Sequence, residues 1–541
     1  MQMMVDADVS GLTQPQAPNW EVLPAKGRLY IKVIEARSLW TPNVLAVPGL
    51  PLRARRPYVV AEFEMNEFIT KEAIETNTFG PQEIANAIEE ERLNYDNAEE
   101  FSGVRNTSPG VWMSPVWRHE ASFDVSQPES ELTISVWDRN DSSDSNEEFL
   151  GMLKIITPMI DGKVYDHWFR LMPRQWNEKV RGDIRIQLMF KTVEGKRLCA
   201  EDFKLLKLVG KGSFGKVMLV KKADTGRVYA MKILNKKDIV KRQEIAHTMS
   251  ERNVLIHNAP SAFLVSLKFS FQTPEKLYLV TDYLSGGELF YHLQRQGCFP
   301  EALAKFYTCE LICALEYLHL NNIAYRDLKP ENVLLDSQGH IALTDFGLCK
   351  ENMTQNQLTN TFCGTAAYLA PEVILAEGYG KSVDWWSLGI LFYEMVMGIP
   401  PFYNENVNLM YRKILHNQLL FEAGQFSAQA ELFASSLLDR NPETRLGSSP
   451  SDALELKQHP YFADVDWSRL ERKLVMPPYK PLVESESDAS YFDPVFTTMM
   501  PADSLPNNSQ SLSTFIQTQF HGFTWTPEKF PSSMRSIRLE D

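Results

Sequence analysis

Cysteine is scarce in this chain of 541 residues, which has six cysteines and no pair in CxxC spacing. We therefore expect neither a zinc ribbon nor a disulfide framework, and we expect a cytoplasmic location, where thiols stay reduced. An excess of basic residues is also absent, because 55 Lys and Arg stand against 69 Asp and Glu. That balance disfavours the class of nucleic-acid-binding proteins.

Long apolar runs are missing as well. The most apolar stretch, Trp385–Gly398, is too short to span a membrane and contains Glu394. The first 20 residues lack the basic start and apolar run of a secretory signal. We interpret Trp385–Gly398 as a buried helix and expect neither a secreted nor a membrane-spanning protein.

The first part of the chain predicts an all-β domain. The length exceeds what a single hydrophobic core supports, so several domains are expected. Residues 1–26 are polar, and we expect them to be disordered. Residues 27–193 contain short alternating patterns, such as Leu29–Ile34 and Glu131–Trp137, which are typical of a β-sandwich. The acid-rich stretch at about 70–110 is interpreted as an insertion loop.

The character of the sequence changes after Cys199. Residues 203–462 begin with strand patterns and continue with long amphipathic helical patterns, such as Leu303–His319. Residues 463–541 are rich in proline and serine and carry isolated aromatic side chains. We expect this last part to be a tail that docks onto the preceding domain.

A glycine-rich loop opens the second domain. Gly210, Gly212 and Gly215 follow the apolar strand pattern Phe203–Val209. Glycines allow the backbone to approach phosphate closely, so amide groups can contact its oxygens. A strand pattern follows this loop, whereas a helix follows the loop of a dinucleotide fold. An oxidoreductase of that class is therefore disfavoured.

Lys232 lies within the apolar strand pattern that follows. A lysine in such a setting is either a snorkelling surface residue or a cation held by a carboxylate. Glu251 lies in a helical pattern, 244–256, and is the natural partner. We expect Lys232 to contact nucleotide phosphates and Glu251 to hold it.

The strongest signal is the pair of segments 325–332 and 343–347. Their polar residues suit phosphoryl transfer, which needs metal ions on the phosphates, a base at the attacking hydroxyl and cations for developing charge. Asp345 and Asn332 carry the oxygen ligands that Mg²⁺ prefers. Asp327 is the candidate base, and Lys329 is the candidate cation for the transferred group. These patterns predict an enzyme that uses ATP and Mg²⁺.

Together, these motifs resemble the protein-kinase signature set. Ala370–Glu372 closes the set, and Arg445 stands where the family has the arginine that pairs with Glu372. The resemblance implies an α+β bilobal kinase fold at 203–462. No essential polar residue is missing, so an active serine/threonine kinase is favoured over a scaffold that only binds ATP. Tyr325 stands where most kinases have histidine.

The resemblance also implies the nucleotide contacts. Asp282 and Leu284 would bond adenine through backbone groups, with Thr281 as gatekeeper, and Glu288 would hold ribose. The full set of implied ATP-binding residues comprises Val209, Gly210, Gly212, Gly215, Val217, Ala230, Lys232, Glu251, Asp282, Leu284, Glu288, Leu334 and Phe492.

Three acids resemble the family's substrate-binding positions. Glu288, Glu331 and Glu394 would face basic residues of the substrate, which implies a kinase that prefers serine or threonine with arginine nearby. One departure from the family is Ala366–Ala367, where Pro-Glu is usual. It removes a rigid residue and a carboxylate from the loop, which would relax substrate positioning.

The activation segment and the tail resemble the AGC group of kinases. Thr361 resembles the activation-loop phosphosite, and Arg326, Lys350 and His247 would supply cations to its phosphate. Residues 520–525 resemble the hydrophobic motif, with Thr524 as phosphosite. The resemblance implies docking beside the helix that carries Glu251. A third phosphosite, the turn site, would be Ser504 or Ser511.

The front domain resembles a C2 sandwich. Its second loop keeps acids that could bind calcium, whereas the first has Arg55-Arg56-Pro57 where an Asp is usual, so calcium binding would be poor. Two roles remain open: a lipid or protein contact through Arg53, Arg55 and Arg56, or an intramolecular brake.

The combination of a C2-like domain, a kinase domain and this tail resembles the fungal Ypk group, relatives of the serum/glucocorticoid-regulated kinases. The resemblance implies activation by a phosphoinositide-dependent kinase and a target-of-rapamycin complex. A lipid contact of the C2-like domain would recruit the protein to the plasma membrane.

Overall fold

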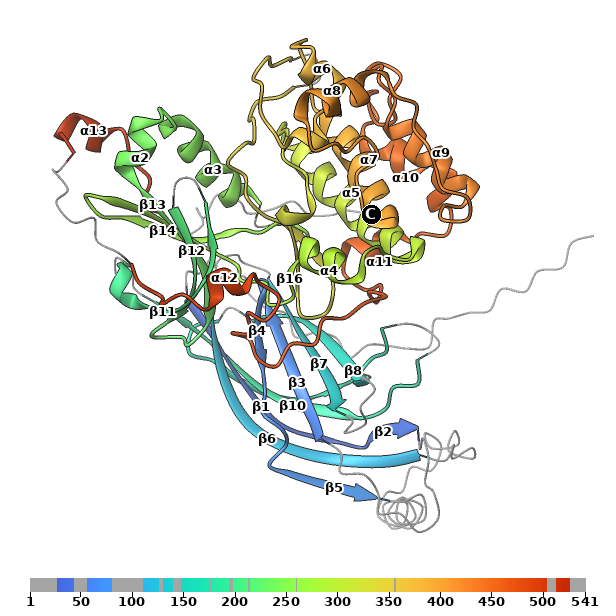
Figure 1. Ribbon diagram of the computed structural model, residues 1–541. Helices are drawn as coiled ribbons and strands as arrows, with labels where there is room; N and C mark the ends of the chain where they lie inside the picture. The colour runs from blue at the N-terminus through green and yellow to red at the C-terminus, as the bar shows by residue number, and fades with distance from the viewer. Residues whose placement is uncertain are drawn as a thin grey trace, which may run out of the picture.

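The computed structural model describes residues 27–42, 56–79, 110–125, 130–139, 147–158, 160–174, 178–193, 198–212, 215–258, 260–354, 357–503 and 512–525. Residues 1–26, which were predicted to be disordered, lie outside this set, and so do Ser504 and Ser511. The described chain begins with a β domain, which lies below a two-lobed domain in Figure 1.

The N-terminal domain is a sandwich of two antiparallel sheets. One sheet has the order β2-β6-β1-β10-β9, with β5 also paired to β6, and the other has the order β4-β3-β7-β8. The strands are β1 (Gly27–Arg37), β2 (Leu39–Pro42), β3 (Arg56–Phe63), β4 (Asn66–Ile69), β5 (Glu75–Phe79), β6 (Gly110–Val125), β7 (Glu131–Arg139), β8 (Glu148–Ile156), β9 (Val164–Arg170) and β10 (Asp183–Thr192).

The core of this sandwich follows the alternation predicted from the sequence. Leu29, Ile31 and Val33 of β1 are buried and alternate with half-buried neighbours. Trp117 lies in the core, and its indole nitrogen donates to the carbonyl oxygen of Pro57 at 3.0 Å. The all-β prediction is therefore confirmed.

The prediction of a loop from about residue 70 was wrong at its start. Residues 75–79 form β5, which pairs with β6 along Glu75–Phe79. The segment Glu-Thr-Asn-Thr-Phe lacks alternating apolar residues, so its strand conformation comes from backbone pairing with the long β6. Residues 80–109 lie outside the described residues.

The first lobe of the second domain is a five-stranded antiparallel sheet with two helices. The sheet order is β11-β12-β13-β15-β14. Its elements are β11 (Phe203–Lys211), β12 (Gly215–Lys222), β13 (Val228–Asn235), α2 (Lys236–Lys241), α3 (Ile245–His257), β14 (Leu267–Gln272) and β15 (Lys276–Thr281). A short 3-10 helix, η1 (Ala200–Asp202), precedes them.

The second lobe is helical and carries a small three-stranded sheet. Its two central helices, α5 (Glu301–Leu320) and α7 (Ser382–Met397), are almost entirely buried. Burial was predicted for α7, whereas α5 was predicted to have only one apolar face. The other elements are β16 (Gly287–Glu288), α4 (Leu289–Gln296), η2 (Pro330–Asn332), β17 (Val333–Leu335), β18 (Ile341–Leu343), η3 (Ala366–Tyr368), α6 (Pro371–Ile374), α8 (Val407–His416), α9 (Ala428–Leu437), α10 (Ala453–Lys457), η4 (Pro460–Phe462) and α11 (Trp467–Glu471).

The tail returns to the first lobe. Its helices are α12 (Pro494–Thr497) and α13 (Thr514–Thr518). Figure 1 shows α12 beside β11 and α13 beside α2. Among the described residues, we find no helix with the length and apolar character that a membrane crossing requires.

Candidate active site

The segment before β17 gathers the predicted catalytic residues around one carboxylate. Lys329 Nζ lies 2.8 Å from Asp327 Oδ2, and Asn332 Nδ2 donates to the same oxygen at 2.9 Å. Thr365, from the segment before η3, donates its hydroxyl to Asp327 Oδ1 at 2.9 Å. Asp327 thus has a fixed orientation toward the activation segment.

A second carboxylate, that of Asp384, binds the backbone of the segment that carries Asp327. Asp384, at the start of α7, accepts hydrogen bonds from the backbone amides of Tyr325 at 2.9 Å and Arg326 at 2.7 Å. His319 Nε2 lies 2.9 Å from Asp384 Oδ2. Arg326 has φ of 68°, a region that non-glycine residues rarely adopt, so these bonds stabilise an unfavourable backbone conformation next to Asp327.

The predicted lysine–glutamate pair is formed. Lys232 on β13 lies with its Nζ 2.5 Å from Glu251 Oε1 on α3 and 3.1 Å from Asp345 Oδ1. Burial would lower the pKa of Lys232, but the charges of Asp345 and Glu251 outweigh it and raise the pKa. Lys232 also lowers the pKa of Asp345, and so both groups are ionised at neutral pH.

The oxygen atoms near this pair fit a magnesium ion. Asp345 has φ of 54°, and half of its side chain is exposed, although Lys232 contacts one oxygen. The amide nitrogen of Asn332 donates to Asp327, so the amide oxygen is the atom left for a cation. A carboxylate and an amide oxygen are ligands that Mg²⁺ prefers.

An apolar cluster lies over the strands expected to bind adenine. Val209 and Phe492 are buried in it, and Val217 and Ala230 pack against it. The Phe492 ring stacks on Tyr283 with centroids 5.7 Å apart. The tail therefore contributes an aromatic side chain here. Leu334 lies apart from this cluster, on β17, where it pairs with Glu288 of β16.

The glycine loop and the connection between the lobes belong to the expected nucleotide site. Gly215 lies where an added Cβ would be 1.8 Å from the carbonyl oxygen of Ile233, so only glycine fits. Gly210 and Gly212 have no such restriction from neighbouring atoms. Asp282 and Leu284, in the connection after β15, are buried.

The three predicted substrate-binding acids lie close enough to affect one another. Burial, then Glu331 and Asp493, raise the pKa of Glu288 to about 7. Burial raises the pKa of Glu394 to about 7, with a further contribution from Glu331 and an opposing hydrogen bond from Tyr368. Glu331 Oε2 is buried without a hydrogen-bond partner. Within the described part of the chain, no cation contributes to the pKa shifts of Glu288 and Glu394.

The activation segment connects to the catalytic loop through Tyr379. Its hydroxyl donates to the carbonyl oxygen of Thr361 at 2.5 Å and accepts from Arg326 at 3.2 Å. Of the other predicted phosphate-binding residues, Lys350 pairs through its backbone with Ala324, and His247 contacts Glu244. Arg326 is the one that the structure links to Thr361.

The end of the tail docks beside α3. Phe520 and Phe523 are completely buried. Arg252 of α3 donates to the carbonyl oxygen of Phe523 at 2.9 Å, and Ser270 of β14 does so at 2.6 Å. The side chain of Thr524 points to solvent, because this residue is exposed. Phe523 therefore contacts the helix that carries Glu251.

The acidic second loop of the N-terminal domain, which comprises Asp138, Asn140, Asp141 and Asp144, is described only at Asp138. This residue is buried, and its Oδ1 accepts the backbone amide of Arg56 at 2.7 Å. Asn140, Asp141, Asp144, Arg53 and Arg55 lie outside the described residues.

Comparison with known proteins decides the identity of this arrangement. Residues 203–462 match the protein kinase domain, residues 483–525 match the protein kinase C terminal domain, and residues 103–171 match the C2 domain. The chain belongs to the protein kinase family. The kinase fold, the AGC-type tail and the C2 domain that the sequence predicted are thereby confirmed.

Three fungal relatives illustrate the similarity. The kinase is 44% identical over 528 residues to serine/threonine-protein kinase gad8 of Schizosaccharomyces pombe, covering 92% of this chain and 84% of that protein. It is 42% identical over 549 residues to YPK1 of Saccharomyces cerevisiae, covering 99% and 76%. It is 43% identical over 546 residues to SCH9 of Candida albicans, covering 93% and 67%. The protein is a serine/threonine protein kinase that uses ATP.

Sequence reasoning missed two supports of the site. The sequence motifs give Thr365 no role of its own, yet its hydroxyl donates a hydrogen bond to Asp327. His319 lies at the end of a helical pattern, and only the fold brings it to Asp384. Nothing in the local sequence around His319 indicates a contact with Asp384.

Proposed function

We propose that this kinase transfers the γ-phosphate of ATP to serine and threonine hydroxyls of protein substrates that carry arginine near the acceptor. The observation that carries the proposal is the convergence of Lys329, Asn332 and Thr365 on Asp327, because each of the three lies within hydrogen-bond distance of its carboxylate. In this proposal, Asp327 accepts the proton of the attacking hydroxyl, and Lys329 stabilises the transferring group.

The nucleotide would bind between the lobes. Lys232, held by Glu251, would bind its phosphates, and Val209, Val217, Ala230 and Phe492 would contact adenine. Bound Mg²⁺, held by Asp345 and Asn332, would neutralise charge on the phosphate oxygens. The glycines of the loop would allow backbone amides to contact the same oxygens.

The acid cluster supports the arginine preference. Glu331 has a buried carboxylate oxygen without a hydrogen-bond partner among the described residues, and its charge helps to raise the pKa of Glu288 and Glu394. A guanidinium group would satisfy these oxygens with several hydrogen bonds. Ala366 and Ala367 contribute no carboxylate to the activation segment. We therefore expect weak selection for substrate arginines that lie farther from the acceptor.

We further propose activation by phosphorylation at Thr361 and Thr524, by a phosphoinositide-dependent kinase and a target-of-rapamycin complex, respectively. The link from Arg326 through Tyr379 to Thr361 supports a role of the first phosphate in positioning the catalytic loop. The contact of Phe523 with α3 supports a role of the tail in aligning Glu251. A third phosphosite, at Ser504 or Ser511, and recruitment of the C2 domain to the plasma membrane complete the proposal.

A pair of peptides tests the substrate class. One peptide carries arginines upstream of serine, and in the other neutral norleucine replaces them. The wild-type kinase should phosphorylate the arginine peptide with the higher kcat/KM, and Glu331→Gln should reduce that ratio mainly through KM. Equal kcat/KM for the two peptides with the wild-type kinase would refute the arginine preference without affecting the assignment as a kinase.

A further inference from the structure

A strained turn of the C2 domain lies against the kinase domain. Strands β3 and β4 are joined by Glu64 and Met65 alone, because Phe63 pairs directly with Asn66. Both turn residues have positive φ, 49° and 60°, a conformation that normally requires asparagine or glycine in such a hairpin. An unfavourable turn persists when its surroundings stabilise it, and here the surroundings are the kinase.

Glu64 belongs to a buried charge network at the connection between the lobes. Lys268 Nζ of β14 lies 2.9 Å from the carbonyl oxygen of Glu64, 3.7 Å from its Oε2 and 3.1 Å from Asp282 Oδ1. The exposed fractions of the three side chains are 7%, 5% and 0% for Lys268, Glu64 and Asp282. Asp282 lies where backbone groups are expected to bind adenine, so a C2 residue helps to fix that connection.

Met65 and Glu67 extend the contact to both lobes. Met65 packs against the core cluster of the kinase. Ser337, in the second lobe after β17, donates to Glu67 Oε1 at 2.6 Å. Arg227, which directly precedes β13 in the first lobe, donates to the carbonyl oxygen of Glu67 at 3.0 Å and to Glu486 of the tail at 2.8 Å. One hairpin thus touches the two lobes and the connection between them.

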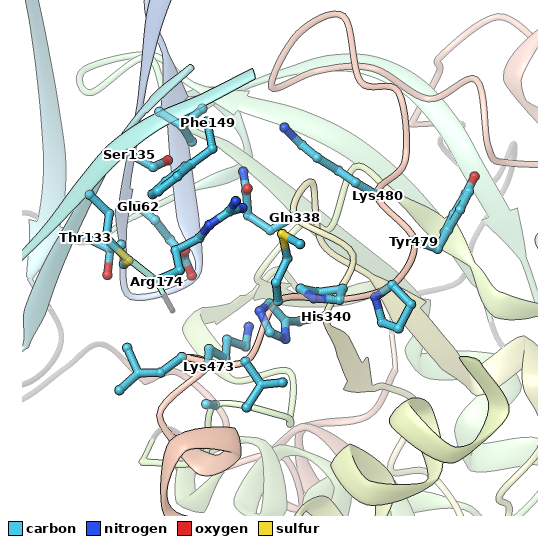
Figure 2. A pocket seen from close by; sticks show the side chains of 18 of the residues that line it. Glu62, Thr133, Ser135, Phe149, Arg174, Gln338, His340, Lys473, Tyr479 and Lys480 are labelled. Atoms are coloured by element: carbon cyan, nitrogen blue, oxygen red, sulfur yellow. The ribbon is translucent and has the colours of Figure 1, made fainter. Parts of the chain in front are cut away.

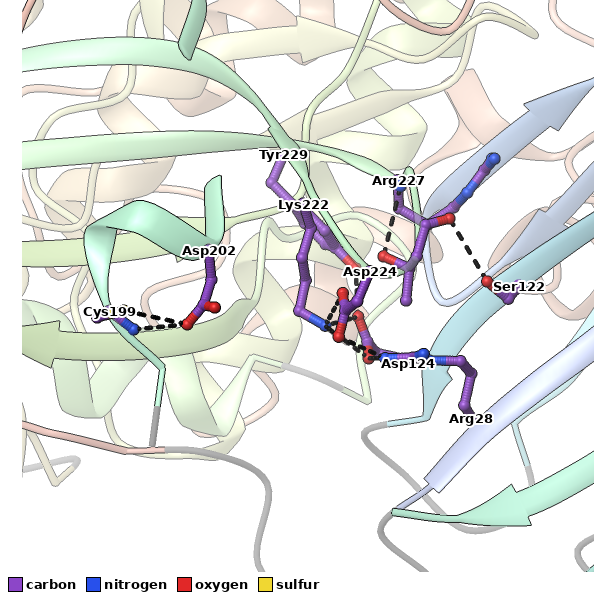
Figure 3. Close-up of polar contacts among 10 residues, drawn as sticks. Arg28, Ser122, Asp124, Cys199, Asp202, Lys222, Asp224, Arg227 and Tyr229 are labelled. Carbon is purple, nitrogen blue, oxygen red and sulfur yellow. Dashed lines mark hydrogen bonds and ion pairs between the residues drawn. The ribbon is translucent and has the colours of Figure 1, made fainter. Parts of the chain in front are cut away.

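The first lobe is held at a further place on the C2 domain. Asp124, at the end of β6, lies 3.1 Å from Lys222 Nζ and accepts the hydroxyl of Tyr229 at 3.2 Å. Arg28 of β1 forms an ion pair with Asp224 at 2.6 Å. Figure 3 shows these groups converging between the two domains.

The C2 domain also contacts the second lobe and the tail, and a cavity of about 1100 Å³ lies between them. Lys480 of the tail forms an ion pair with Glu147 at 2.7 Å and lies 3.6 Å from the centre of the Trp137 ring. Arg469 donates to the carbonyl oxygen of Arg174 at 2.6 Å. Figure 2 shows Arg174 and Phe149 on the C2 side of this cavity, and Lys473, Tyr479 and Lys480 on the other.

We propose that the C2 domain is an intramolecular brace, in which the hairpin residues Glu64–Glu67 position the two lobes and their connection for ATP binding. The docked arrangement contains the formed Lys232–Glu251 pair, with Asp345 beside it. If contact with the C2 domain inhibited the kinase, we would expect it to separate Lys232 from Glu251. Because the two residues are paired in the docked arrangement, we infer that docking favours ATP binding. The role rests on the proposed ATP site and adds a positioning element from outside the kinase domain.

The test compares three variants of the full chain. Glu67→Lys places a cation beside Arg227 and displaces the hairpin, whereas Glu67→Gln keeps an acceptor for Ser337. Glu120→Lys makes the same charge change on the exposed face of the C2 domain, where the Glu120 side chain is 70% exposed. The dissociation constant of ATP is measured by calorimetry, and KM and kcat by phosphate transfer.

We expect Glu67→Lys to raise the dissociation constant and KM for ATP about tenfold, as when the binding-competent arrangement falls to about a tenth of the population. The kcat at saturating ATP should change less than about twofold, and Glu67→Gln and Glu120→Lys should match the wild type. An unchanged dissociation constant in Glu67→Lys, or a lower one, would overturn the proposal. Calorimetry measures ATP binding and therefore tests the brace even if the protein transfers no phosphate. A lack of phosphate transfer would refute the proposed function and not the brace.

A second comparison applies if Glu67→Lys fails to fold. Glu67→Ala and Ser337→Ala remove the same hydrogen bond from opposite sides of the interface. Their effects on the dissociation constant of ATP should be smaller in combination than their sum. Additive effects, or no effect of Ser337→Ala, would contradict the brace.

Discussion

Replacing Phe523 with alanine should release the tail from α3. The side chain is completely buried, and its backbone carbonyl accepts hydrogen bonds from Arg252 and Ser270. Truncating a buried phenylalanine costs about 3–5 kcal/mol. At the lower value, the docking equilibrium constant falls about 100-fold, because each 1.4 kcal/mol corresponds to a factor of ten. Release would leave Glu251 without the contacts that align its helix.

Hydrogen exchange and phosphate transfer would measure this effect. Trp525 and Ser270 exchange backbone hydrogen bonds of 2.8 and 2.9 Å, so the amide of Ser270 should lose protection in Phe523→Ala. The kcat/KM should fall in parallel. Met500→Ala is the matched control, since this tail residue is large, apolar and 90% exposed. Retained protection of Ser270 together with unchanged kcat/KM would refute the reasoning.

Three further predictions follow from buried charges. Arg445→Met should lower the free energy of unfolding by about 3–5 kcal/mol in urea denaturation, because it leaves Glu372 as a buried charge without its bidentate partner at 2.7 and 2.9 Å; a loss below about 1 kcal/mol would contradict this. The KM for an arginine peptide should fall as pH rises from 6 to 8, since burial raises the pKa of Glu288 and Glu394 to about 7 and both become charged in this window; a norleucine peptide should show no such trend. The KM for ATP should rise as pH increases from 6 to 8, because burial, then the charges of Asp336 and Glu62, raise the pKa of Glu67 to about 8 against opposing hydrogen bonds with Ser337 and the nearby Lys480. Docking favours the neutral carboxyl and therefore weakens over this pH range, and a trend that persists in Glu67→Gln would exclude this cause.

The sequence predicted the site well where chemistry demands particular residues in order. Asp327, Lys329 and Asn332 lie on one short segment, so their spacing already places them together. The Lys232–Glu251 pair was predicted from a strand followed by a helix, and the structure has that pair between β13 and α3. The alternation of β1 predicted its buried face for the same local reason.

Contacts between distant segments could not be predicted in this way. The strand β5 has no alternation of apolar residues that would predict it. It is stabilised by backbone pairing with β6, which the local sequence does not reveal. The turn at Glu64 and Met65 has positive φ values although it contains neither asparagine nor glycine, and Met65 packs against the core of the kinase domain. The link between Lys268 and Glu64 joins residues 204 positions apart and has no signal in either local sequence.

The central claim is that Asp327 accepts the proton of the substrate hydroxyl in a kinase site that is otherwise intact. Asp327→Asn keeps the shape of the side chain but removes the base. We would measure phosphate transfer from labelled ATP, with Mg²⁺, to an arginine peptide, and ATP binding by calorimetry, in both proteins phosphorylated at Thr361. The account predicts transfer by the wild type, a loss of about 10²–10⁴-fold in kcat for the variant, and equal ATP affinity. Equal transfer rates in the two proteins, or no transfer by a wild type that binds ATP, would contradict it.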